Sequence, residues 1–204
     1  MIGLFDSGLG GLTVARAILD RLPGESLIYF GDTARLPYGP KSPDTVRRYS
    51  REIAGFLHGE GVKAIVVACN TATAHGLTAL RTELPVPVIG VIEPGARAAV
   101  AASALGSIGV LGTAGTVRSG AYERAIRELS PRARIVSQAC PLFVPLVEEG
   151  WTDHAATRLV AAEYLAPLVT AGVDAVHDVA EHLLQLLLAP RPPFAQGGRA
   201  RDGG

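Results

Sequence analysis

Short hydrophobic runs alternate along the chain with longer stretches in which hydrophobic residues recur every three or four positions. The runs predict six strands, over residues 2–5, 26–30, 63–68, 86–91, 107–111 and 134–137. In one stretch between them, Val46, Ile53 and Leu57 share a helical face, and Ser42 and Pro43 would start that helix well. Strands that alternate with helices in this way are typical of β/α units on a parallel sheet.

Two further helices are predicted by the same spacing. One follows the first strand, and its predicted buried face carries Leu12, Ala15, Ile18, Leu19 and Leu22. The other covers residues 153–170 and ends at Ala171-Gly172. We therefore expect an α/β protein whose sheets are mainly parallel and flanked by helices.

The chain is expected to divide near Glu93-Pro94-Gly95 into a first lobe over residues 1–93 and a second over 94–176. Residues 177–189 have the spacing of an amphipathic helix, which would pack on the first lobe. Since this helix follows Asp174 with almost no room for a strand, the second lobe is expected to be incomplete. Residues 190–204 are rich in proline, glycine and arginine and predict a disordered tail.

Composition narrows the function. The 204 residues are 48% hydrophobic and 19% charged, which is ordinary for a soluble globular protein, and 19 basic residues balance 19 acidic ones. That balance gives no electrostatic case for nucleic acid or a membrane surface. No apolar segment is long enough to cross a bilayer, and the start of the chain lacks the features of a signal peptide. Two cysteines make no disulfide framework, so we expect a cytoplasmic protein.

Cofactor signals are also missing. The five histidines and two cysteines have no metal-ligand spacing, so no metal site is predicted. Only Lys41 and Lys63 are available for the Schiff base that pyridoxal phosphate needs. Neither nucleotide-binding glycine motif is present, and no cofactor is expected.

Polar loops follow the first two predicted strands, at the sheet edge where open parallel sheets bind ligands. Asp6-Ser7-Gly8 opens a helix, where glycines and the helix N-terminus favour an anion such as a carboxylate. The alternative is a tight turn in which Asp6 or Ser7 caps the helix. Tyr38 and Gly39 offer a hydroxyl and a backbone amide to a ligand, or they form only a turn.

Cys69 follows the third predicted strand and heads a helix, with Asn70 and Thr71 beside it. A helix N-terminus lowers the pKa of a thiol, so this position favours a reactive or ligand-contacting cysteine. The alternative is a buried structural thiol, which is the more natural interpretation of Cys140 in its apolar surroundings.

The second half of the chain repeats the arrangement of strand, small polar loop and helix. Thr113 and Thr116 there form a second candidate anion cradle, or simply a capped helix start. Glu148 is a candidate site residue or a solvated helix end, and His177 is interpreted as a helix cap.

Together these segments resemble the glutamate racemases of the cofactor-independent aspartate/glutamate racemase family, almost continuously from residue 1 to about 174. The matching stretches are residues 2–13, 29–35, 37–39, 67–72, 91–95, 112–113, 116, 118–119 and 140–146. The resemblance implies two pseudo-symmetric α/β lobes with glutamate in the cleft between them, and homodimers are common in the family.

The resemblance also implies a mechanism. One cysteine thiolate removes the α-proton and a second thiol donates a proton from the opposite face, without pyridoxal phosphate or metal. The product, D-glutamate, is used for peptidoglycan synthesis. By motif match, Cys69 is the first proton-transfer cysteine. The implied substrate contacts are Asp6, Ser7, Tyr38, Gly39, Asn70, Thr71, Thr113, Thr116 and Glu148.

One departure from the family pattern leaves alternatives open. Members carry their second cysteine in a Gly-Cys-Thr-His segment after the Ala-Gly-Val-Asp motif, whereas Asp174 here leads to a sequence that resembles the family's C-terminal helix. The chain is therefore a glutamate racemase, a remnant that binds an acidic amino acid or a partner protein without turnover, or an unstable fragment. The sequence does not place Cys140 opposite Cys69 as a replacement.

Overall fold

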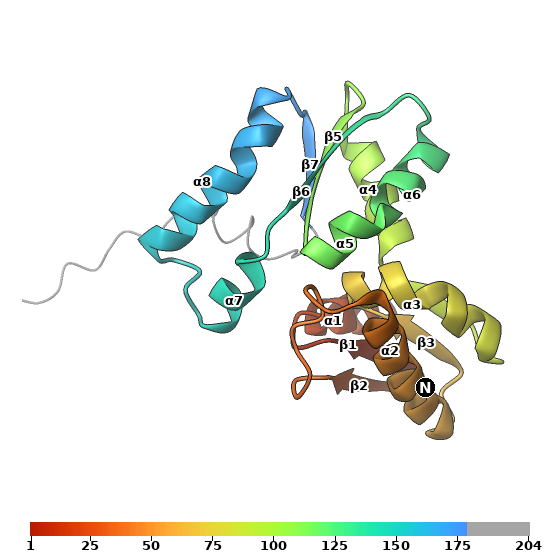
Figure 1. Ribbon diagram of the computed structural model, residues 1–204. Coiled ribbons are helices and arrows are strands. Elements are labelled where there is room, and N and C mark those ends of the chain that lie inside the picture. The colour runs from red at the N-terminus through yellow and green to blue at the C-terminus, as the bar shows by residue number, and fades with distance from the viewer. Residues whose placement is uncertain (179–204) are drawn as a thin grey trace, which may run out of the picture.

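The computed structural model describes residues 1–178, and the chain forms two α/β lobes (Figure 1). The first contains a four-stranded parallel sheet in the order β2-β1-β3-β4, and the second a three-stranded parallel sheet in the order β6-β5-β7. The predicted fold class, with two parallel sheets flanked by helices, is confirmed.

In the first lobe, strands alternate regularly with helices. Its elements are β1 (Ile2–Asp6), α1 (Leu12–Arg21), β2 (Leu27–Gly31), α2 (Pro43–Gly59), β3 (Ala64–Val67), α3 (Asn70–Glu83) and β4 (Val88–Gly90). α2 starts as the sequence predicts, because the Ser42 hydroxyl accepts the N–H of Thr45 and Pro43 occupies the first turn.

Alternate residues of the central strands face opposite sides of the first sheet. Phe5, Ile65 and Val67 pack with the buried faces of α2 and α3, whereas Leu4 and Val66 pack with α1. The face predicted for α1 is only partly correct: Ala15 is buried, but the side chains of Leu12, Leu19 and Leu22 are exposed. One helix covering one side of a short sheet buries only the middle of its apolar stripe.

The second lobe is built around β5 (Ser107–Gly112), which is buried along its whole length. Its other elements are α4 (Ile92–Ala102), α5 (Ala114–Ser119), α6 (Ala121–Leu129), β6 (Arg134–Ala139), α7 (Phe143–Glu148), α8 (Ala155–Thr170) and β7 (Ala175–Asp178). α4 and α6 pack on one side of this sheet and α7 and α8 on the other (Figure 1).

One detail of the predicted organisation changes. The Glu93-Pro94-Gly95 segment, expected to mark the division between the lobes, is the first turn of α4, and Ile92 and Ala96 of that helix pack in the second lobe. Residues 175–178 form β7, paired in parallel with β5, so the predicted helix over 177–189 is wrong at its start. The rest of that helix and the predicted tail lie outside the described residues.

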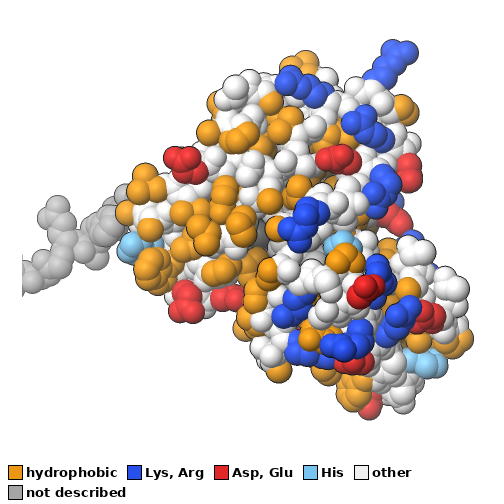
Figure 2. Space-filling model, viewed as in Figure 1, with side chains coloured by type: hydrophobic (Ala, Val, Ile, Leu, Met, Phe, Trp, Pro, Cys, Tyr) orange, Lys and Arg blue, Asp and Glu red, His pale blue; other side chains and the backbone are white. Residues whose placement is uncertain are grey.

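Charged and hydrophobic side chains are unevenly distributed on the face seen in Figure 2. Figure 2 shows charged side chains of both signs spread over the first lobe, where Arg35 pairs with Glu52 and Arg51 with Glu83. Hydrophobic side chains gather on the part of the second lobe that α7 and α8 occupy. In this part of the sequence, Leu142 and Trp151 beside α7 and Leu159 of α8 are exposed. Within residues 1–178, no helix combines the length and apolar character that crossing a bilayer requires.

Candidate active site

Strand order places the candidate site. The chain passes from β1 to β2 on one side and then returns to place β3 on the other side of β1. Loops at the carboxyl ends of β1 and β3 therefore diverge at a topological switch point, which is where open α/β sheets bind ligands. These are the loops that begin at Asp6 and at Ala68, and the second sheet repeats the arrangement around β5.

A cleft of about 420 Å³ opens between the lobes at these strand ends. Its lining includes nine of the ten residues predicted from the sequence, namely Asp6, Ser7, Tyr38, Gly39, Cys69, Asn70, Thr71, Thr113 and Glu148. Thr116 lies behind the lining and reaches it through Thr71 and Thr113. The lining residues that sequence reasoning missed are mostly glycines and apolar residues beside the motifs, such as Gly8, Gly10 and Phe143.

The Asp6 loop combines the two interpretations offered for it. The Asp6 carboxylate accepts the N–H of Gly11 at 2.9 Å, so it does hold the start of α1, and it also lines the cleft. A Cβ atom on Gly11 would lie 2.7 Å from the Asp6 Cβ and 2.9 Å from the Ala68 Cβ, which is too close for any side chain. Gly11 therefore allows the loop to close tightly and to keep the carboxylate beside the Cys69 loop.

Cys69 sits at the start of α3 with 5% of its surface exposed. Its sulfur accepts the N–H of Ala72 at 3.4 Å and lies 3.5 Å from the Ser7 hydroxyl oxygen. Burial first, and the Asp6 carboxylate second, raise the pKa of the thiol to about 12. The expectation of a lowered pKa for the Cys69 thiol is therefore wrong, because loss of solvation outweighs the helix N-terminus.

Tyr38 lines the cleft, and its hydroxyl is held by another residue of its own loop. The hydroxyl donates to the carboxylate of Asp32, which also accepts Arg35 Nε at 2.7 Å. Burial and this carboxylate raise the pKa of Tyr38 well above its ordinary value. The proton of the Tyr38 hydroxyl is thus used to fix the loop, and the predicted ligand contact of this hydroxyl stays a prediction in which its oxygen would accept a hydrogen bond.

Three threonine hydroxyls join the lobes behind the cleft. Thr71 Oγ1 lies 2.9 Å from Thr113 Oγ1 and 3.2 Å from Thr116 Oγ1, and the last two are 3.1 Å apart. Beside them the Gly115 N–H donates to the Gly39 carbonyl at 2.9 Å. These contacts set the spacing between the two walls of the cleft.

The far wall contributes a carboxylate and a thiol. Glu148 comes so close to the Asp6 loop that a Cβ on Gly8 would lie 3.4 Å from its Oε1. Burial, followed by the charge of Asp6, raises the pKa of Glu148. Cys140, interpreted from the sequence as a structural thiol, is buried but lines the same cleft as Cys69.

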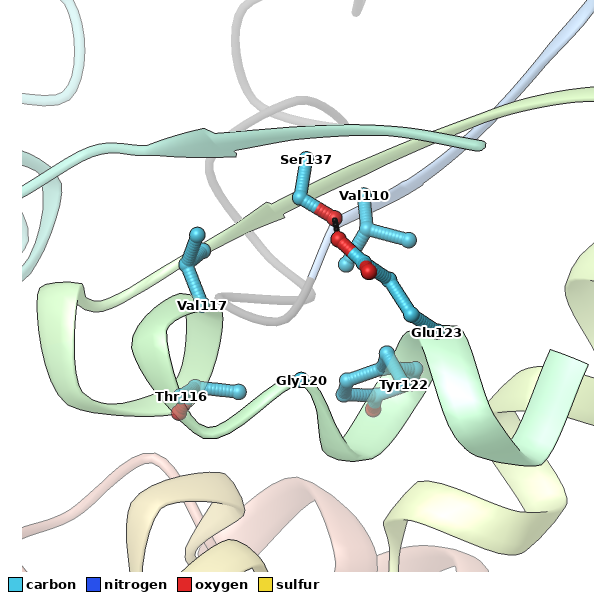
Figure 3. Close-up of a pocket in the computed structure, with 7 residues that line it drawn as sticks. All are labelled: Val110, Thr116, Val117, Gly120, Tyr122, Glu123 and Ser137. Atoms are coloured by element: carbon cyan, nitrogen blue, oxygen red, sulfur yellow. Dashed lines mark hydrogen bonds between the residues drawn. The ribbon is translucent and has the colours of Figure 1, made fainter. Parts of the chain in front are cut away.

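A second hollow lies in the second lobe between the sheet and α6 (Figure 3). There the Ser137 hydroxyl donates to the Glu123 carboxylate at 3.0 Å, and the surrounding side chains leave no volume for a ligand. Among residues 1–178, no group of three or more histidine, cysteine, aspartate or glutamate side chains is arranged to hold a metal ion.

Comparison with known proteins agrees with this arrangement. A family model described as Asp/Glu/hydantoin racemase matches residues 10–177. The chain is 58% identical over 173 residues to a glutamate racemase of Geobacter metallireducens, and 51% identical over 174 residues to one of Neisseria gonorrhoeae. Each match covers 85% of this chain and 64% of the relative, so the chain spans just under two thirds of the relatives' length.

Solved structures give the same result. A glutamate racemase of Bacillus anthracis superposes with a TM-score of 0.86 at 44% identity, over 91% of this chain and 70% of that one. The Francisella tularensis glutamate racemase in complex with D-glutamate gives 0.84 at 37% identity, over 90% and 70% of the two chains. With 168 consecutive residues matched by the family model and these relatives, the chain belongs to the Asp/Glu/hydantoin racemase family.

Proposed function

We propose that this protein interconverts L- and D-glutamate without a cofactor, with Cys69 transferring the proton at the substrate Cα. The observation that carries the proposal is the cleft itself, which brings the Cys69 thiol together with Asp6, Asn70 and Thr71 from one lobe and Glu148 from the other. The similarity to glutamate racemases over most of the chain supports the choice of reaction.

The cleft is chemically suited to an acidic amino acid. Asp6 and Glu148 supply negative charge for the substrate ammonium group, and the N-terminus of α3 with Asn70 and Thr71 supplies donors for a carboxylate. An ammonium group close to Asp6 would offset the carboxylate that raises the Cys69 pKa. Substrate binding would thereby favour the thiolate that the reaction needs.

Inversion requires two proton carriers, since one base returns the proton to the face it came from. The sequence lacks the Gly-Cys-Thr-His segment that carries the second cysteine in the family. Cys140 is the other cysteine of the chain and it lines the cleft. Because that segment is missing, the second candidate function is binding of an acidic amino acid without inversion at Cα.

Incubation with L-glutamate in D2O separates these functions. A two-base racemase produces D-glutamate that carries deuterium at Cα, whereas a single base exchanges the α-proton and keeps the L configuration. We expect the wild-type protein to form deuterated D-glutamate, and Cys69→Ala to form it at least about a thousandfold more slowly. A loss of D-glutamate formation in Cys140→Ser would identify Cys140 as the second proton carrier, and an unchanged rate would exclude it. Folded protein that binds L-glutamate and forms no D-isomer would overturn racemisation and leave the binding function.

The same proposal includes a cytoplasmic location and a homodimer. Cys69 and Cys140 are both free and buried, which suits a reducing compartment. Light scattering during size-exclusion chromatography tests the dimer, and a monomer at all concentrations would contradict it.

A further inference from the structure

Three side chains from three elements form a hydrogen-bonded chain that leads from the second sheet to the Cys69 loop. The hydroxyl of Tyr122, at the start of α6, donates to Asn70 Oδ1 at 2.7 Å. The Nε2 atom of His177, in β7, lies 3.1 Å from the same hydroxyl, and the two ring centroids are 5.1 Å apart. Figure 3 shows Tyr122 at the start of α6, with its hydroxyl turned away from the sheet.

The number of protons fixes the direction of this chain. A tyrosine hydroxyl has one proton, and Tyr122 gives it to Asn70. The contact between His177 and Tyr122 is then a hydrogen bond only if His177 carries a proton on Nε2 and donates it. The bond from Tyr122 holds the carbonyl oxygen of the Asn70 side chain toward α6, and Asn70 lines the cleft.

Packing around the chain is tight enough to hold this arrangement. Tyr122 is 3% exposed, and Gly95 of α4 lies against both partners. A Cβ on Gly95 would be 2.6 Å from His177 Nε2 and 2.8 Å from the Tyr122 hydroxyl oxygen. Glycine at this helical position therefore leaves the space that the hydrogen bond occupies. Burial also lowers the pKa of His177, which favours the neutral ring, and the hydrogen bond to Tyr122 then requires the tautomer that carries its proton on Nε2.

We propose that Tyr122 and His177 are positioning residues that hold the Asn70 side-chain amide in one orientation beside Cys69, with its carbonyl oxygen toward Tyr122, so that the amide is fixed where an amino acid enters the cleft. The identity of the ligand rests on the proposed function, whereas the orientation of Asn70 does not. His177 does not line the cleft, so it acts on the cleft only through Tyr122 and Asn70.

The sequence offers a direct probe, because Asn70 is the sole asparagine in the chain. Labelling with ¹⁵N-asparagine gives a single side-chain NH2 pair in an NMR spectrum. We expect one sharp pair in the wild-type protein, and displaced or broadened signals in Tyr122→Phe, which removes only the hydroxyl. Gly95→Ala, which drives a methyl group between His177 and Tyr122, should have the same effect.

Matched controls separate the hydrogen bond from general disturbance. Tyr49→Phe removes a hydroxyl from α2, and Gly55→Ala adds a methyl group on α2 where nothing lies within 4 Å. Both should leave the Asn70 signals in place. His177→Gln keeps an N–H donor and should restore the wild-type signals that His177→Phe loses. Unchanged Asn70 signals in Tyr122→Phe, Gly95→Ala and His177→Phe would overturn the proposal.

Affinity for D-glutamate, measured by calorimetry, gives the functional result. We expect Tyr122→Phe and His177→Phe to raise the dissociation constant about tenfold, and His177→Gln to raise it by less than about threefold. Equal affinities in all variants would overturn the positioning role. A wild-type protein that fails to bind D-glutamate would instead contradict the proposed function, and the NMR comparison would still decide the orientation of Asn70.

Discussion

The Cys69 sulfur lies 3.5 Å from the Ser7 hydroxyl oxygen, and Cys69 itself is almost fully buried. Hydrogen bonds from Ser7 and Ala72 stabilise the thiolate, but burial and the Asp6 carboxylate oppose it more strongly. The Cys69 thiol is therefore protonated near neutral pH, and a positive charge beside Asp6 would favour its ionisation.

The pH dependence of alkylation tests this state. Only the thiolate reacts with iodoacetamide, and an unperturbed cysteine has a pKa of about 8.5. In a Cys140→Ser background, we expect the Cys69 rate to keep rising from about pH 7 to about pH 11, because its pKa is raised to about 12. In urea the rate should level off above about pH 9. A plateau near pH 8.5 in the folded protein would contradict a raised pKa.

Much of the fold follows from the order of hydrophobic runs. Each of the six predicted strands is present with ends that move by a few residues, and Ser42 starts its helix as expected. β7 is missed because Ala175 to Asp178 is short and runs into a helical pattern in the sequence. Pairing with β5, a contact between residues more than sixty positions apart, decides its conformation.

The candidate site is predictable in position and not in chemistry. Loops at the ends of parallel strands converge by topology, so Asp6, Cys69 and Thr113 could be brought together from the sequence. Which group accepts the Tyr38 proton, and how far burial raises the pKa of Cys69, depend on neighbours that no local motif specifies. The same is true of His177, which meets Tyr122 only through the sheet.

Tyr38→Phe should destabilise the protein without changing the shape of the cleft. Removing the hydroxyl takes a donor from the buried carboxylate of Asp32 and leaves Arg35 as the side-chain partner that holds it. We expect a loss of about 1–3 kcal/mol in the free energy of unfolding, measured by urea denaturation. Tyr49→Phe, which keeps the neighbouring ring, is the control and should change stability by less than about 0.5 kcal/mol. Equal stability of the two variants would argue against a structural role for the Tyr38 hydroxyl.

Gly115→Ala should separate the walls of the cleft. The added Cβ would lie 2.7 Å from the Gly39 carbonyl oxygen, so the Gly115 N–H could no longer donate to it in its present position. We expect a loss of about 1–3 kcal/mol in unfolding free energy and weaker D-glutamate binding. Gly59→Ala, at the end of α2 where no atom lies within 4 Å, should instead be neutral or slightly stabilising. If Gly115→Ala binds D-glutamate as tightly as the wild type, the hydrogen bond between Gly115 and Gly39 is not needed to set the spacing of the cleft walls.

Asp174 should make the second lobe sensitive to acid. Its carboxylate accepts Ser103 Oγ at 2.7 Å, the Leu105 N–H at 2.6 Å and the Ser107 N–H at 3.1 Å, and these bonds lower its pKa. A carboxyl group with a lowered folded-state pKa stabilises the fold above its unfolded pKa of about 3.9, and this contribution is lost as the pH falls through the folded value. Asp174→Asn should therefore melt at a lower temperature than the wild type near neutral pH, and the difference should shrink as the pH falls below about 4. Asp153→Asn, which alters an exposed carboxylate before α8, serves as the control and should follow the wild-type curve. If the difference in melting temperature between Asp174→Asn and the wild type stays constant across this pH range, the loss of charge is not what destabilises the variant. Only titration of Asp174 can remove the advantage of the carboxylate in acid.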